Sequence, residues 1–263
     1  MAITTLDGII SGATAPQNFY KVGAATVIGR FFSLFYQNGY PGGALVNTSG
    51  VSGATLTSYS GQIPFTNPPS GQYSYLSKFS AVSNVAGTLL LCDRLWHNSG
   101  LATNSTSTQA VNSVAFPARD SNQAINGESC FLGLEITTVM AAGAPVITVG
   151  YTSSGGVQAS GTTTLVTASP AGSFYPIALV SGHTGFQTVR NFTSSVSVAT
   201  GAYSLVCYRV LASVDIGTGF GSQLDAITSG FPRLFDNTVP FLLWLPATVT
   251  APTITGQMII TQG

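Results

Sequence analysis

Short β-like segments separated by breakers fill most of the chain after residue 100, and this pattern constrains the fold more than any other feature. Each segment is rich in Thr, Ser and β-branched residues and is bounded by Gly, Pro or Asn, which is typical of strands in an all-β domain. Along Tyr203–Val214 both alternating sets of residues are largely apolar, as expected for a strand covered on both faces. The predicted strands are Val111–Phe116, Phe131–Met140, Pro145–Tyr151, Thr162–Thr167, Phe174–Val180, Phe186–Ser197, Tyr203–Val214, Pro240–Leu245 and Thr253–Thr261.

The first hundred residues have a different pattern. Apolar residues at helical spacings, followed by Asn38-Gly39, predict a helix over Val27–Tyr36. Gly and Pro are dense between Pro41 and Pro69, which predicts long ordered loops of the kind that usually make contacts. The segment Tyr75–Asn84 is predicted to be extended, and Gly87–Trp96 is predicted to be a buried turn of helix.

These segments together predict a mainly β protein. The expected architecture is an antiparallel β-sandwich, similar to a jelly roll, with one or two short helices near the N-terminal half. The sequence has no fixed-period repeat and no clear linker, so we expect a single β-rich domain over residues 1–263. In that domain, residues 1–100 form a helix and long-loop part that packs as an arm or subdomain on the sandwich of residues 101–263. A division into two domains near Gly100 is the alternative.

The small number of charged residues indicates which kinds of partner this chain can bind. Charged residues make up 6% of the chain, against roughly 25% in a typical soluble domain. Eight basic and eight acidic residues give no net charge, so the chain lacks the basic stripe that neutralises nucleic-acid phosphates. A neutral polar surface has little electrostatic repulsion, which favours packing against copies or partners.

Other features set the expected environment. Mean hydropathy is +0.36, which argues against disorder. No apolar run approaches the roughly 18 residues of a membrane-spanning helix, and we expect no membrane partner. The N-terminus lacks a basic region and carries Asp7, so no export signal is predicted.

The three cysteines, Cys92, Cys130 and Cys207, are odd in number and lie in apolar segments. This pattern predicts buried thiols rather than a disulfide framework.

The two histidines are weak candidates for chemistry. Asp93, four residues before His97 and next to Cys92, would share a helical face with that histidine and form a possible metal site. The favoured interpretation is that Asp93, Arg94 and His97 tether the segment by hydrogen bonds. His183 lies in the loop SGHTG, where a general base is less favoured than a solvated turn histidine, since no GxSxG elbow accompanies it.

Signatures of phosphate binding and glycoside cleavage are also incomplete. The turn Gly217–Gly221 lacks the Lys-Ser/Thr ending of a phosphate-binding loop. Glu128 and Glu135 are the only glutamates and do not pair in the sequence. We therefore expect no enzyme activity, no catalytic residues, no metal and no cofactor. A hydrolase whose carboxylates converge only in the fold is a less favoured alternative.

Aromatic residues in uncharged loops are the clearest candidates for contact. Aromatics beside Gly, Ser and Asn suit protein interfaces, and they also suit stacking on sugar rings. The competing interpretation is that half or more of them fill the core. The predicted interface residues are Phe19, Tyr20, Tyr36, Tyr40, Tyr59, Phe65, Tyr73 and Tyr75.

Three segments carry a resemblance to a known class: LTSYSGQIPFTNP (Leu56–Pro68), GTLLLCDRLWHNSG (Gly87–Gly100) and FPARD (Phe116–Asp120). The sequences of these segments, mainly within residues 1–135, resemble those of virion structural proteins encoded by tailed bacteriophages. The resemblance implies a β-rich capsid-associated protein, of the cement or decoration type, that binds the outer shell as a trimer or other oligomer. The resemblance does not identify any individual contact residue.

The first hypothesis is therefore a non-enzymatic structural protein of a phage particle that binds the capsid shell as an oligomeric cement or decoration subunit. Its expected partners are copies of itself, most simply as a trimer, and the major capsid protein, with no nucleic acid and no membrane. The expected location is the capsid of the virion, after synthesis in the cytoplasm of the host bacterium. The alternative is a receptor- or carbohydrate-binding module of a tail fibre or head fibre.

Overall fold

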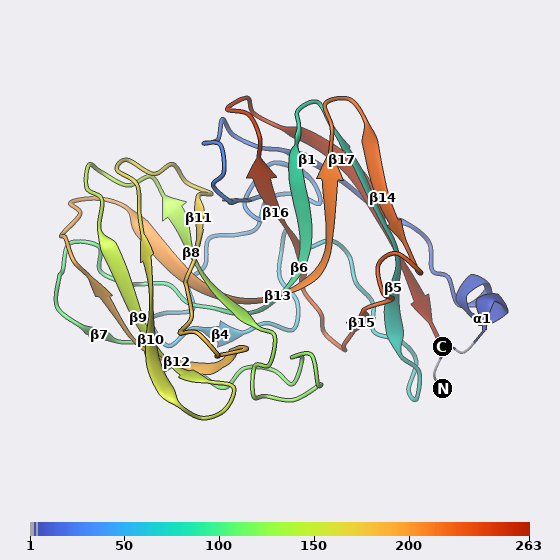
Figure 1. Cartoon of the computed structure of the whole chain (residues 1–263), viewed down its shortest axis with the longest axis horizontal. Helices are drawn as coiled ribbons and strands as arrows, with labels where there is room; N and C mark the ends of the chain where they lie inside the picture. Colours follow the sequence, from blue (N-terminus) through green and yellow to red (C-terminus); the bar gives the residue numbers. More distant parts are fainter. Residues whose placement is uncertain (1–2, 4) are drawn as a thin grey trace. The chain divides into compact units, whose positions relative to one another are not determined.

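A computed structural model describes residue 3 and residues 5–263. In the described chain, 44% of residues are in strands and 2% in helix. The chain divides into two compact units (Figure 1). The first unit comprises Met1–Leu45, Thr57–Asp93 and Val210–Gly263, and the second comprises Val46–Leu56 and Arg94–Arg209.

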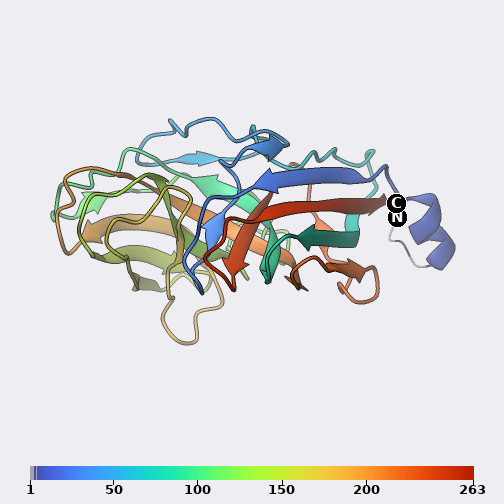
Figure 2. The same ribbon diagram turned by 90° about the horizontal axis from the view of Figure 1, so that it is seen from above.

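A single helix is found among the described residues, α1 (Leu6–Ser11). It begins at Thr5, whose Oγ1 accepts a hydrogen bond from the Gly8 N–H at 3.1 Å, and this bond satisfies one of the first N–H groups of the helix. Backbone bonds tie the following residues to the end of the last strand, with Gln262 N donating to Gly12 O at 2.9 Å. Figure 2 shows α1 beside the C-terminal end of that strand.

The first unit contains an antiparallel sheet of six strands in the described chain, in the order β14-β5-β17-β1-β3 with β15 beside β5. Its strands are β1 (Gln17–Val22), β3 (Gly39–Tyr40), β5 (Ser74–Ser83), β14 (Gly221–Asp225), β15 (Arg233–Leu234) and β17 (Thr253–Gln262). Side chains alternate along these strands, so Phe19, Phe79 and Met258 point into a buried core. The opposite face of the sheet carries Asn18, Tyr20 and their neighbours.

The second layer of this unit is formed by the first part of β6 (Gly87–His97), β16 (Pro240–Pro246) and β2 (Phe32–Ser33), paired antiparallel in that order. Leu89, Leu91 and Trp244 of this layer pack in the same core cluster as Phe19 and Phe79. Burial of two apolar faces against each other defines a β-sandwich.

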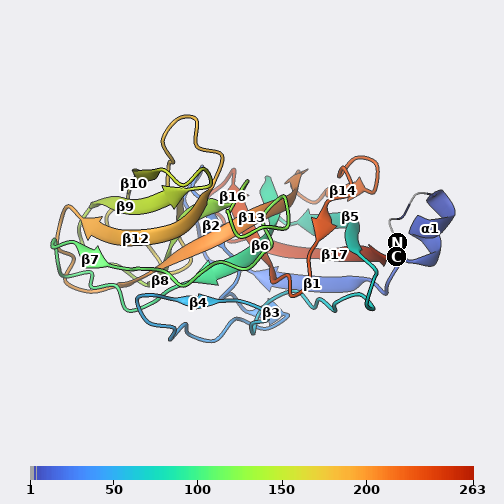
Figure 3. The same ribbon diagram turned by 90° about the horizontal axis from the view of Figure 1, so that it is seen from below.

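The second unit has its own core and two groups of strands. One sheet has the order β10-β9-β12-β7 (Figure 3). In the other group β8 pairs with β11 and with the start of β13, and β4 pairs with the end of β6. Its strands are β4 (Ala54–Thr55), β7 (Gln109–Ala110), β8 (Phe131–Thr138), β9 (Val146–Ser153), β10 (Gln158–Thr164), β11 (Phe174–Pro176), β12 (Phe186–Ser194) and β13 (Ala202–Ile216), of which β13 continues into the first unit.

The structure confirms the predicted antiparallel β-sandwich with a short helix near the N-terminus. The helix predicted over Val27–Tyr36 is wrong, because this segment is irregular apart from β2. The helical turn predicted over Gly87–Trp96 is also wrong, because these residues form β6. Most of β6 is buried, and a continuous apolar run covered on both faces cannot be distinguished from a buried helix by periodicity. Residues 111–116, predicted as a strand, lie outside the strands.

Two smaller predictions concern the thiols and the domain arrangement. Cys92, Cys130 and Cys207 are buried thiols, as predicted. The arrangement of one domain with an arm of residues 1–100 stays a prediction. In the part of the chain that the structure describes, no helix has the length and apolar character needed to span a membrane.

Candidate functional site

The eight predicted interface aromatics all lie in the first unit. Phe19 is only 1% exposed and stacks on Phe79, with ring centroids 5.9 Å apart. It is therefore a core residue and is not available to an interface in the folded unit. Its neighbour Tyr20 points to the opposite face because side chains alternate along a strand.

Tyr20 and Tyr40 form an exposed pair. They are directly opposite each other on β1 and β3, and their side chains are 43% and 60% exposed. Partners across an antiparallel pair lie on the same face of the sheet. The same cross-strand row continues through Thr255 on β17 and Val82 on β5. We call the residues Tyr40, Tyr20, Thr255 and Val82 the tyrosine row.

Tyr36, Tyr59 and Phe65 are half-buried. The ring of Tyr59 stacks on Phe35 at 5.7 Å, and that of Tyr36 meets Phe35 edge-on at 5.3 Å. Phe65 packs against the core of the first unit. Truncating these rings would remove packing within the unit, so they are poor reporters of an interface.

Tyr73 and Tyr75 are held by residues of the 231–235 segment. Tyr75 and Phe231 stack nearly parallel, at 4.7 Å between centroids and 6° between planes. The Arg233 guanidinium lies 3.9 Å from the centre of the Tyr73 ring, a cation–π contact. These contacts fix both tyrosines, although 39% of Tyr73 stays exposed.

A buried lysine shapes the strand that carries Tyr40. Lys21 points inward from β1 and is 2% exposed. Its Nζ donates to the carbonyl oxygens of Gln37, Pro41 and Gly42 at 3.3, 2.8 and 3.3 Å. Desolvation by burial lowers the pKa of Lys21 from 10.5 to about 8. The ammonium group thus ties a residue before β3 to the residues after it, a role that no sequence pattern indicated.

Replacing Lys21 by Met should remove a pH-dependent contribution to stability. Between pH 8 and 10.5 the unfolded lysine binds more protons than the folded one, so the free energy of unfolding of the wild type rises with pH across this window. The expected slope is about 1 kcal/mol per pH unit. Urea unfolding of wild type and Lys21→Met at pH 7.5, 9 and 10.5 measures it. Parallel pH profiles of the two proteins would contradict the assignment.

A groove lies beside the tyrosine row on the outer face of the same sheet. Its volume is about 490 Å³, within the range of roughly 300–1,000 Å³ typical of small-molecule sites. A second cross-strand row lines it, formed by Asn18 on β1, Gln257 on β17, Ser80 on β5 and Gln223 on β14. We call these four residues the carboxamide row. Figure 1 shows β1, β17, β5 and β14 side by side.

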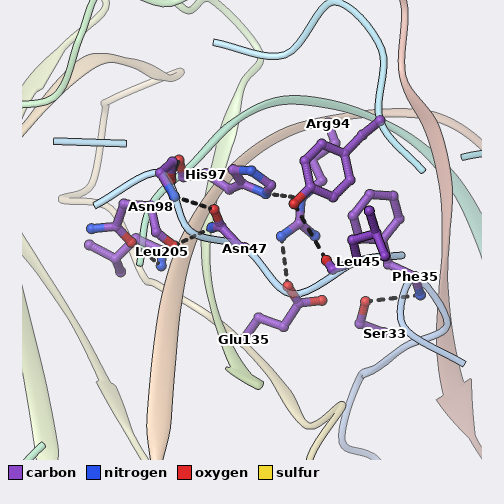
Figure 4. Close-up of polar contacts among 11 residues, drawn as sticks. Ser33, Phe35, Leu45, Asn47, Arg94, His97, Asn98, Glu135 and Leu205 are labelled. Carbon is purple, nitrogen blue, oxygen red and sulfur yellow. Dashed lines mark hydrogen bonds and ion pairs between the residues drawn. The ribbon is translucent and has the colours of Figure 1, made fainter. Parts of the chain in front are cut away.

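The cluster around His97 is structural. His97 lies on β6, and its Nδ1 accepts a hydrogen bond from Arg94 Nε at 3.2 Å (Figure 4). Arg94 also forms a fully buried ion pair with Glu135 at 2.7 Å. Burial, with the positive charge of Arg94, lowers the pKa of His97 to about 2, which keeps its ring neutral. The predicted tethering by Arg94 and His97 is present, on a strand instead of a helix.

Asp93 and Cys92 make no metal site with His97. Asp93 Oδ1 accepts a hydrogen bond from Val239 N at 2.9 Å within the first unit. Burial, with the neighbouring Asp93 carboxylate, raises the pKa of the Cys92 thiol, which opposes the thiolate form that metals require. Among the described residues, no group of three or more His, Cys, Asp or Glu side chains is arranged to hold a metal ion.

The fold brings Glu128 and His183 to one polar pocket of about 390 Å³ in the second unit. Glu128 Oε2 accepts from Thr184 Oγ1 at 2.8 Å. Tyr151 Oη accepts a hydrogen bond from Val180 N at 2.9 Å and shares a second hydrogen bond with His183 Nδ1 at 2.8 Å. Both groups are thus committed to holding loops, which agrees with a turn histidine more than with a general base.

Comparison with known proteins gives little. No protein-family profile and no curated protein matches this chain. Two structures with a weak likeness are the VP2 subviral particle of infectious bursal disease virus, at 9% identity and TM-score 0.22, and the Gx strain of the same virus, at 9% identity and TM-score 0.23. They cover 95% of this chain and 81% and 80% of those chains, respectively. Similarity this low carries no argument about the function of this chain.

Proposed function

We propose that this chain is a non-enzymatic structural subunit of a virus particle, a cement or decoration protein of a tailed-phage capsid that binds the shell and its own copies. Its expected partners are copies of the chain, as a trimer, and the major capsid protein. The observation that carries it is the uncovered apolar side of α1.

The helix α1 has no buried residue. Leu6 and Ile10 are one turn apart and are 69% and 66% exposed, so they lie on one side of the helix. A helix of six residues is not stable by its own propensity, and in proteins most helical stability comes from packing of an apolar face. An apolar side left open is therefore best explained by a neighbouring subunit that covers it.

A second apolar group supports the same proposal. Val27, Ile28 and Val249 are exposed, and they lie on two loops joined by a backbone bond from Thr26 N to Val249 O at 3.3 Å. Contiguous apolar surface of this kind marks interaction sites on soluble proteins more often than scattered single residues do. With 6% charged residues, subunits of this chain meet little electrostatic repulsion.

Replacing both Leu6 and Ile10 by Ser should weaken assembly without unfolding the protein, because neither side chain is buried in the free chain. Light scattering over a dilution series should show an oligomer for the wild type and a dissociation constant raised about tenfold or more for the variant. Purified particles that lack this chain should take up the wild type in stoichiometric amounts and the variant less well.

Val139→Ser is the matched control, since Val139 is an exposed apolar residue of the second unit. It should leave the oligomer and its uptake by particles unchanged. A wild type that is monomeric at every concentration and does not add to particles would overturn the proposal. So would an α1 variant that assembles as well as the wild type.

The alternative, a carbohydrate- or receptor-binding module, is favoured by a different observation, the groove beside the tyrosine row. A module of this kind would bind saccharide without adding to particles in stoichiometric amounts. The two functions therefore differ in whether particles take up the chain in stoichiometric amounts. One chain can also carry out both functions on separate surfaces.

A further inference from the structure

Four strands place polar, uncharged side chains in line across the outer face of the six-stranded sheet. Asn18 is opposite Gln257, Gln257 is opposite Ser80, and Ser80 is opposite Gln223. Three carboxamides and a hydroxyl therefore form the carboxamide row. These residues lie far apart in the sequence and meet only through strand pairing.

The carboxamides of this row are not used in side-chain hydrogen bonds among the described residues. The side chains of Asn18, Gln223 and Gln257 make no hydrogen bond to another described residue. Each carboxamide has one acceptor oxygen and two donor hydrogens. The row therefore presents both donors and acceptors to whatever enters the groove, at positions that paired strands hold more rigidly than loops would.

The floor of the groove is close to the backbone. Gly221 has no side chain to cover this face, and Ala81 and Gly256, whose Cβ positions face the core, also line the groove, so a ligand can approach the main chain there. Along one side runs the tyrosine row, in which Tyr20 is directly opposite the groove residue Thr255. The lining residues, all within the described chain, include no Asp, Glu, Lys, Arg or His.

We propose that this groove binds a neutral oligosaccharide. Sugar hydroxyls are donors and acceptors at once and match carboxamides and Ser80, whereas the apolar face of a pyranose ring matches an aromatic ring such as Tyr20. A charged glycan or an ionic peptide would find no counter-charge among the described lining residues. The groove volume, about 490 Å³, suits a short stretch of sugar chain.

This site is separate from the helix surface on which the proposed function depends. The groove is formed by β1, β17, β5 and β14, whereas the assembly proposal depends on Leu6 and Ile10 of α1. A capsid subunit with such a groove would attach the particle to neutral cell-surface or extracellular polysaccharide. Loss of saccharide binding and loss of assembly are measured separately, so either proposal can fail alone.

The full chain should be tested on an array of neutral malto-, cello-, chito- and manno-oligosaccharides beside sulfated and carboxylated glycans, followed by titration calorimetry with the best neutral probe. We expect binding to neutral probes and not to the anionic ones. Asn18→Ala combined with Gln257→Ala should weaken that binding about tenfold or more. Gln158→Ala, at an exposed carboxamide on β10 of the second unit, is the matched control and should have no effect.

Gly221→Leu fills the groove without removing a hydrogen-bonding group. A Cβ at Gly221 would meet only the Ala81 carbonyl oxygen, at 3.7 Å, so the sheet should keep its fold, and binding should be lost. The proposal would be overturned if the wild type bound none of the neutral probes, or if the wild type and the Gly221→Leu variant bound them equally well. If the Asn18 and Gln257 substitutions instead changed the oligomer mass in light scattering and left saccharide binding unchanged, the groove would be a contact between copies.

Discussion

Glu135→Ala should destabilise the protein by about 3–5 kcal/mol, because it leaves the Arg94 guanidinium buried without its carboxylate. Both side chains are fully buried, and Arg94 Nη2 lies 2.7 Å from Glu135 Oε2. Removing one member of such a pair costs more than the pair itself contributes, since the remaining charge must stay desolvated. Urea denaturation, followed by far-ultraviolet circular dichroism, measures the change as a lower midpoint.

Glu128→Ala is the natural control, since Glu128 is the other glutamate of the chain. It is half-exposed and accepts one side-chain hydrogen bond, from Thr184, so its loss should cost about 1 kcal/mol or less. The paired substitution Arg94→Met with Glu135→Leu should recover part of the stability, because neither charge of this pair is then left buried without its partner. Equal unfolding midpoints for Glu135→Ala and Glu128→Ala would show that Glu135 is not needed to compensate the buried charge of Arg94.

Gly39→Ala should cost about 2–3 kcal/mol and disrupt the pairing of β3 with β1. Gly39 has a φ of +142°, a conformation that side-chain-bearing residues rarely adopt, and an added Cβ would overlap the Tyr20 carbonyl oxygen. Because Gly39 is opposite Lys21 and Tyr40 is opposite Tyr20, the substitution should also misplace one end of the tyrosine row. Hydrogen exchange of the amides at residues 38–40 reports the loss of pairing directly.

Gly42→Ala is the matched control, three residues further along the chain and outside β3. A Cβ there meets nothing within 4 Å, and the residue does not have a positive φ. It should leave both the unfolding midpoint and the hydrogen exchange of the β3 amides as in the wild type. If Gly39→Ala behaved like Gly42→Ala, the close approach of β3 to β1 would not be essential to the fold.

The strand-rich part of the chain could be predicted because its signals are local. Segments such as Phe131–Met140 and Thr253–Thr261 are bounded by breakers and enriched in β-branched residues, and they correspond to β8 and β17. The segment Gly87–Trp96 was misassigned because a strand buried on both faces and a buried helix have the same apolar composition. The exposed helix α1, with few apolar residues at a helical period, gave no comparable signal.

The candidate sites were less predictable. The sequence indicated aromatic residues of the first unit as contact residues. Tyr20 and Tyr40 are indeed exposed as a pair. Phe19 is in the core, because it is next to Tyr20 on β1 and adjacent side chains of a strand point to opposite faces. The role of Lys21 could not be predicted, since its three carbonyl partners lie on either side of β3, 16 to 21 residues away. Glu128 and His183 meet in one pocket only because three loops converge there.

The β class, the buried thiols and the low content of charge can be predicted from the sequence, because composition and strand periodicity are local properties of the chain. Which residues share a face depends on the three-dimensional fold. Asn18, Ser80, Gln223 and Gln257 become neighbours through antiparallel register, and register depends on which strands pair and on the burial of one face of each strand. Both the groove and the ion pair of Arg94 with Glu135 are products of that long-range pairing.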